Sequence, residues 1–114
     1  MPNHQYEAGD RFEKRVMNDL RRRGYQSWQT RGSKSAADII ALTPREHDAS
    51  LLVQVKSGVK QPGHAEFNAL LDTALKAAAW AIIADRDGRK IRYRLITGYH
   101  TYRSRDWPAE EYSP

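Results

Sequence analysis

Three polar residues with the chemistry of a phosphodiester-cleaving site stand beside two short apolar runs. Asp38 precedes the run Ile-Ile-Ala-Leu, and Gln54 and Lys56 lie within the run Leu-Leu-Val-Gln-Val-Lys. A carboxylate and an amide oxygen can hold a hard divalent cation such as Mg²⁺ together with waters and substrate phosphate. A lysine nearby can orient the attacking water or stabilise charge on the phosphate. These residue types predict hydrolysis of a phosphodiester bond.

The two apolar runs are expected to be strands that place these side chains together. They are rich in β-branched residues and are separated by an interval with the composition of a turn. In a strand, Gln54 and Lys56 point to one face and the valines beside them point to the other. If the strands pair with Asp38 alongside, the three groups converge. The alternative is that Asp38 caps a turn and the other two residues line a solvated face.

Length and composition indicate one small domain. The chain has 114 residues, within the usual size range of a single domain, and no cysteine, which excludes disulfides and thiolate zinc sites. The N-terminus lacks a signal-peptide pattern, and the longest apolar run, residues 77–84, is far too short to span a bilayer. We therefore expect a soluble, cytoplasmic protein with no membrane partner.

The charge of the chain favours a polyanionic partner. The net charge is +5 and the pI is about 9.7, with basic residues clustered at residues 21–23 and 86–94. Nucleic acid is the first candidate for such a surface, although genome composition and solubility can produce it too. Arg92 and Arg94 share one face of an expected strand, and that face is predicted to meet either phosphate or solvent.

The order of the expected elements predicts an α/β domain. Apolar residues recur at helical spacing in residues 8–23 and 65–79, and the Asp-Gly pair at 87–88 marks a hairpin turn. With strands at residues 25–30, 80–85 and 91–97 and two more within 38–56, the order is αβββαββ. This order gives a central mixed β-sheet flanked by helices. We expect residues 1–7 to be a flexible tail, 8–97 to be the domain, and 98–114 to be a C-terminal tail that packs across the domain or against a partner.

Other residues are candidates for contacts with the cation or the nucleic acid. Glu13 lies at the edge of the apolar stripe of its helix, where a carboxylate needs a cation or a donor, so it is a candidate metal ligand. An exposed helix glutamate is the alternative. Arg31 and Lys34, in a small loop before Asp38, suit phosphate binding, and an ordinary surface turn is the alternative. Lys60 is a further candidate contact to nucleic acid.

Four motifs in a fixed order carry a family resemblance. They are Gly-Asp-Arg-Phe-Glu-Lys-Arg-Val, Gly-Tyr, Arg-Gly-Ser-Lys-Ser-Ala-Ala-Asp-Ile-Ile-Ala and Gln-Val-Lys, within residues 8–57. In this order they resemble the archaeal-type Holliday junction resolvases and their phage relatives, in the PD-(D/E)xK nuclease superfamily. The resemblance implies a restriction-endonuclease-like core, a phage or prokaryotic source, and an endonuclease that uses Mg²⁺ or Mn²⁺.

The resemblance also implies roles for individual residues. The metal-side triad, which is also the implied set of metal ligands, is Glu13, Asp38 and Gln54. The resemblance gives catalytic roles to this triad, to Lys56, the lysine of the motif, and to Ser33 of the loop. The implied nucleic-acid-binding residues are Arg31, Lys34, Ser35 and Lys60. Ser35 could also take the place of Ser33 if the loop register differs. Two positions depart from the family pattern. Ala37 replaces the motif proline, which is harmless, and Gln54 replaces the usual glutamate, which should lower metal affinity.

We therefore expect a structure-selective, metal-dependent endonuclease that hydrolyses phosphodiester bonds in branched DNA, with Holliday junction resolution as the leading function. A four-way junction has two-fold symmetry and is resolved by two symmetric cuts, which predicts a C2 homodimer. One alternative is a nuclease with the same core that acts on other DNA or RNA. Another is a catalytically silent nucleic-acid-binding module, which would need no divalent ion.

Overall fold

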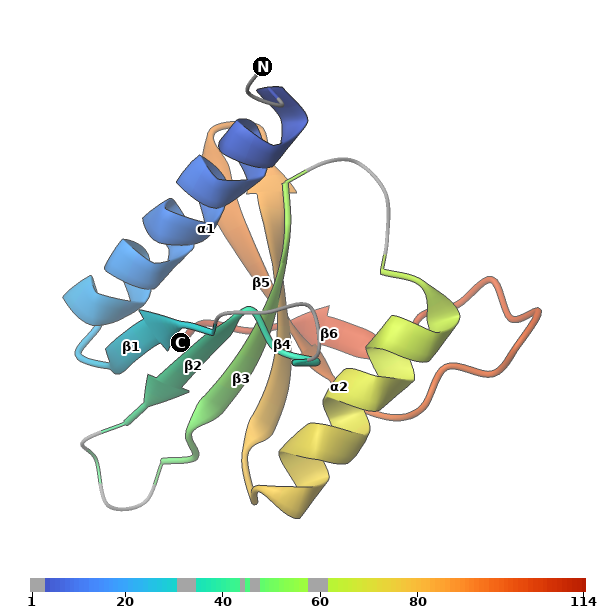
Figure 1. Ribbon diagram of the computed structural model, residues 1–114. Helices are drawn as coiled ribbons and strands as arrows, with labels where there is room; N and C mark the ends of the chain where they lie inside the picture. Colours follow the sequence, from blue (N-terminus) through green and yellow to red (C-terminus); the bar gives the residue numbers. More distant parts are fainter. Residues whose placement is uncertain (1–3, 31–34, 44, 46–47, 58–61) are drawn as a thin grey trace.

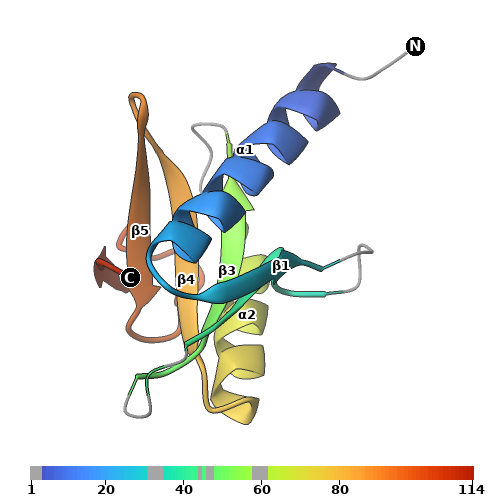
Figure 2. The same ribbon diagram turned by 90° about the vertical axis from the view of Figure 1, so that its left-hand side faces the viewer.

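The fold is a mixed β-sheet with one helix on each face (Figures 1 and 2). The computed structural model describes residues 4–30, 35–43, 45, 48–57 and 62–114. Neighbouring strands are antiparallel except β3 and β4, which are parallel and are joined through α2, so the predicted mixed α/β sheet is confirmed. The described residues form two helices and a six-stranded sheet whose strands lie in chain order: α1 (His4–Arg22), β1 (Gln26–Gln29), β2 (Ile39–Leu42), β3 (Leu51–Lys56), α2 (His64–Lys76), β4 (Trp80–Asp87), β5 (Lys90–Ile96) and β6 (Ala109–Glu111).

The two faces of the sheet carry separate apolar cores. The apolar stripe of α1, centred on Val16, packs against one face, which includes Val53. The apolar side of α2, centred on Leu70, packs against the other face, which includes Leu52. Because side chains alternate along a strand, residues 54 and 56 share the α2 face with Leu52. The predicted division of β3 is confirmed.

The helix α1 begins at His4, inside the segment expected to be a tail. It ends where the sequence predicts, because Gly24 takes a φ of +99°, which a glycine adopts without a steric penalty. The N–H of Tyr25 then donates to the carbonyl of Leu20 at 3.1 Å, as in a Schellman cap.

No helix in the described part of the chain has the length and apolar character needed to cross a membrane.

The C-terminal segment, expected to be a tail, packs across the domain and contributes the edge strand β6. The ring of His100 stacks on Trp107 with 3.8 Å between centroids. Asn68 of α2 exchanges two hydrogen bonds with the backbone of His100, at 3.0 and 2.8 Å. β6 reads Ala-Glu-Glu and has no β-branched or aromatic residue, so its composition does not predict a strand.

The arginine face of β5 meets a buried carboxylate of the neighbouring strand. Arg92 donates to both oxygens of Asp85 at 2.8 Å, and Arg94 donates to one of them at 3.0 Å. Asp85 is only 6% exposed, on the strand next to them. The prediction of phosphate or solvent for this face did not include this carboxylate, which the hairpin register places opposite Arg92. The side chain of Arg92 is also 39% exposed, so the face is partly solvated, and phosphate binding there stays a prediction.

Candidate active site

A pocket of about 510 Å³ opens beside the carboxyl end of β3, where residues of α1 and of the first turns of α2 also reach its wall. Five of the side chains that the sequence predicts for the site line it: Glu13, Ser35, Asp38, Gln54 and Lys56. They come from the helix α1, the strand β3 and the segment before β2. The structure therefore brings together most of the described residues that the sequence singled out.

Asp38 is held firmly between two strands. Its N–H donates to the carbonyl of Val53 at 2.8 Å, and its carbonyl accepts the N–H of Thr30 at 2.9 Å. The side-chain Oδ2 accepts the N–H of Val55 at 2.8 Å, which fixes the orientation of the carboxylate. The antiparallel register of β2 and β3, continued by one residue, places Asp38 opposite Gln54. The predicted pairing of the strands with Asp38 alongside is confirmed.

Two carboxyl groups of the pocket, Asp38 and Glu13, have raised pKa values, so their ionised forms are disfavoured. Burial raises the pKa of Asp38, and the Glu66 charge raises it further, whereas the bond from the Val55 N–H and the charge of Lys56 oppose this rise. Burial also raises the pKa of Glu13, and the negative charge of Asp38 raises it again. The two predicted carboxylates are therefore close enough to repel each other. A cation between them would relieve that repulsion.

Glu66 is a residue of the pocket that the sequence analysis missed. Its Oε2 lies 2.9 Å from the ammonium of Lys56 and 3.3 Å from Nε2 of Gln54. The signal was available, since a helix that connects two parallel strands runs back from the carboxyl end of the first strand. Its first turn therefore lies near the last residues of β3. An acidic residue in that turn, such as Glu66, can then reach Lys56.

The donor set of the pocket fits a hard divalent cation. Among the described residues, no group of three or more His, Cys, Asp and Glu side chains has the spacing of a metal centre. Mg²⁺, however, binds through one or two carboxylates and keeps waters and phosphate as further ligands. Within the described structure, the buried Oε1 of Gln54 has no hydrogen-bond partner. Gln54 therefore presents an acceptor that a cation would satisfy, beside the carboxylate of Asp38.

The remaining predicted contacts divide into two groups. Ser35 is exposed and lines the pocket, and its hydroxyl accepts the N–H of Ala37 at 3.3 Å. The other candidates lie outside the described residues: Arg31, Ser33, Lys34 and Lys60.

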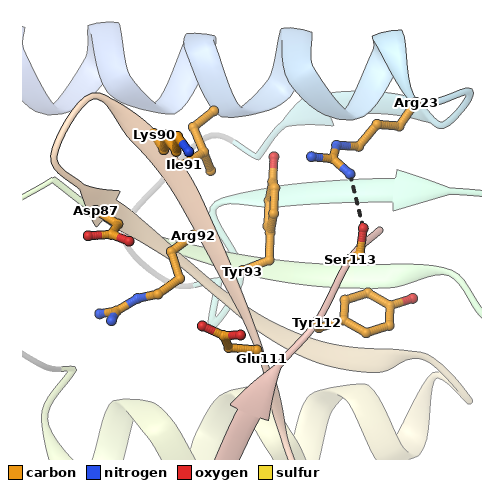
Figure 3. A pocket seen from close by; sticks show the side chains of 9 residues that line it. All are labelled: Arg23, Asp87, Lys90, Ile91, Arg92, Tyr93, Glu111, Tyr112 and Ser113. Atoms are coloured by element: carbon orange, nitrogen blue, oxygen red, sulfur yellow. Dashed lines mark hydrogen bonds between the residues drawn. The ribbon is translucent and has the colours of Figure 1, made fainter.

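A second pocket, of about 390 Å³, lies between the end of α1 and the strands β5 and β6 (Figure 3). Its charges are mixed and several are already paired. Arg23 binds Asp19 at 2.9 Å, and the hydroxyl of Tyr93 donates to the same carboxylate at 2.7 Å. Figure 3 shows Arg23 reaching the Ser113 hydroxyl and Tyr93 directed towards α1. The residues that line this pocket connect the C-terminal segment to the domain. They do not have the arrangement expected of a catalytic site.

Comparison with known proteins identifies the fold. No family model and no curated protein sequence matches the chain. Among solved structures, the chain is similar to Archaeoglobus fulgidus Hjc, described as a Holliday junction resolvase from an archaeal hyperthermophile. The similarity has a TM-score of 0.61 and 24% sequence identity, and it covers 73% of this chain and 72% of that one. The resemblance predicted from the motifs is therefore confirmed at the level of the fold: this chain has the α/β fold of the resolvase.

Proposed function

We propose that this protein is a metal-dependent endonuclease that cuts branched DNA, with the four-way junction as its leading substrate. One observation carries the proposal: Asp38, Gln54 and Lys56 line a single pocket at the end of β3, in a fold shared with a Holliday junction resolvase. The net charge of +5 supports a polyanionic substrate.

Each residue of the pocket has a role in this proposal. Asp38, Gln54 and Glu13 hold the Mg²⁺ or Mn²⁺ ion through oxygen atoms. When bound, such an ion supplies Lewis-acid polarisation of the phosphate and activation of water. Lys56 holds the attacking water and stabilises the charge that develops on the phosphate. Ser33 and Arg31 fit the scissile strand, as the family resemblance implies.

The proposed substrate also requires two copies of the chain. A four-way junction is resolved by symmetric cuts in two strands, and each copy carries one such pocket. We propose a C2 homodimer whose axis coincides with the two-fold axis of the junction. Sedimentation equilibrium with and without junction DNA measures this state directly.

The test is cleavage of an end-labelled immobile four-way junction and its matched linear duplex, each with Mg²⁺, Mn²⁺ or EDTA. We expect paired symmetric nicks in the junction alone, lost with EDTA. The variants Asp38→Asn and Lys56→Ala should abolish cutting but largely spare junction binding, since most phosphate contacts lie elsewhere. If both variants cut at the normal rate, the assignment of the site is wrong. Equal cutting of the linear duplex would show that the protein is a nuclease without selectivity for the junction.

A second candidate function is a nucleic-acid-binding module without catalysis. Two observations favour it: position 54 carries an amide rather than a carboxylate, and the ammonium of Lys56 forms an ion pair with Glu66. The same assay separates the two functions, because such a module binds the junction equally well in EDTA and leaves it uncut in either metal.

A further inference from the structure

The pocket contains a carboxylate that compensates for the one missing from β3. Glutamine at position 54 keeps a carbonyl oxygen but has no charge, so β3 contributes no carboxylate to the pocket, and the segment before β2 contributes Asp38. Glu66 lines the same pocket from the first turn of α2. The negative charge removed from the strand is thus present on the helix.

The contacts of Glu66 place its charge beside two other polar side chains of the pocket. One oxygen, Oε2, is shared between the ammonium of Lys56 at 2.9 Å and the amide nitrogen of Gln54 at 3.3 Å. Its side chain is 53% exposed, so it can shift without breaking the core. Burial raises the pKa of Asp38, and the negative charge of Glu66 adds to this rise.

Gln54 provides an independent sign that a ligand belongs here. The residue is 8% exposed, and its Oε1 has no hydrogen-bond partner within the described structure. The contact with Glu66 engages the nitrogen end of this amide, so the oxygen end is the one left for a ligand. A buried acceptor without a donor is expensive unless a cation or a donor reaches it. Because the carboxylates of Asp38 and Glu66 line the same pocket, a cation is the complementary ligand.

We propose that Glu66 is a third carboxylate of the divalent-cation site, beside Asp38 and Glu13, and replaces the one that position 54 lacks. The inference rests on the proposed function, because it concerns the same site. In the structure Glu66 neutralises Lys56. When Glu66 turns to the cation, the ammonium of Lys56 becomes available for the scissile phosphate. The same residue therefore couples loading of the site to release of the lysine.

The test measures Mn²⁺ binding to the full chain without DNA, by calorimetry and by the electron paramagnetic resonance signal of free Mn²⁺. We expect Glu66→Gln to weaken binding by about tenfold or more. Glu110→Gln is the matched control, because it makes the same change at an exposed glutamate of β6, and it should bind as the unmodified protein does. The variant Asp38→Asn should lose most of the binding.

A charge exchange completes the test. Gln54→Glu combined with Glu66→Gln returns the carboxylate to the strand and should restore binding to within about threefold of the original affinity. If Glu66→Gln binds Mn²⁺ as tightly as Glu110→Gln, or if the exchange restores nothing, the inference is overturned. A protein whose Mn²⁺ affinity depends on Glu66 but which cuts no DNA would retain the inference and refute the nuclease. If the protein cuts DNA but Glu66→Gln leaves the Mn²⁺ affinity unchanged, the nuclease function would be retained and the inference refuted.

Discussion

We predict that Asp85 stabilises the folded protein, and that its arginine partners contribute more to folding than to DNA binding. Its side chain is 9% exposed, compared with 16% for Arg94 and 39% for Arg92. Asp85→Asn keeps the shape but removes the charge that faces two guanidinium groups. Removing one partner of a buried ion pair costs about 3–5 kcal/mol. Because Arg92 is partly solvated, we expect the lower end, about 3 kcal/mol.

The loss should be visible in thermal and chemical unfolding. For a chain of 114 residues, an unfolding entropy of about 2.1 cal/mol/K per residue converts 3 kcal/mol into a fall in Tm of roughly 12 °C. Asp48→Asn is the matched control, since Asp48 pairs with Arg45 at 2.9 Å while both side chains are largely exposed. It should change the free energy of unfolding by less than about 0.5 kcal/mol.

A parallel measurement of junction affinity decides what the arginines do. We expect Arg92→Gln to lower the free energy of unfolding while the affinity for the junction, and its dependence on salt, change little. If Asp85→Asn melts like the Asp48→Asn control, the ion network contributes nothing to stability. A salt-dependent loss of junction affinity in Arg92→Gln, with stability intact, would show that the face binds phosphate after all.

Two further predictions concern the stability of the fold. Since burial raises the pKa of Asp38, folding disfavours its ionised form, so stability decreases as pH rises through the raised pKa. Asp38→Asn should therefore be more stable than the unmodified protein near pH 7, and urea titrations should show this gain vanish below the ordinary aspartate pKa of 3.8. Ala78 has a φ of +52°, so Ala78→Gly should stabilise by about 0.5 kcal/mol, whereas Ala77→Gly, at φ −90°, should destabilise by a similar amount in the same titration.

Local periodicity was enough to predict the strand part of the site. The alternation of side chains in β3 places Gln54 and Lys56 on one face. Asp38 joins them on condition that the two strands pair with Asp38 alongside, as the register of the structure shows. These predictions need no knowledge of how the helices pack. The position of Glu66 depends on the path of α2 across the sheet. It follows only when the crossover between parallel strands is drawn explicitly.

The ion network of Asp85 could not be predicted from the local signal. The Asp-Gly pair predicts a two-residue turn at residues 87–88, and counting back from that turn would put Asp85 opposite Lys90. In the structure Asp87 pairs with Lys90, so the turn lies one residue later and Asp85 lies opposite Arg92. The strand β6 depends on tertiary packing against β5 and has no local signal.

Buried polar groups in the pocket differ in their partners from two buried polar residues elsewhere in the described part of the chain. Asp85 binds its arginines, and His100 has Asn68 and a ring partner. At the pocket, the described structure combines a buried amide oxygen without a donor with carboxylates whose pKa is raised. Each feature destabilises the folded protein alone, and one cation would relieve them together. The presence of these unfavourable features in one pocket is the physical reason to look for a metal ion at the end of β3.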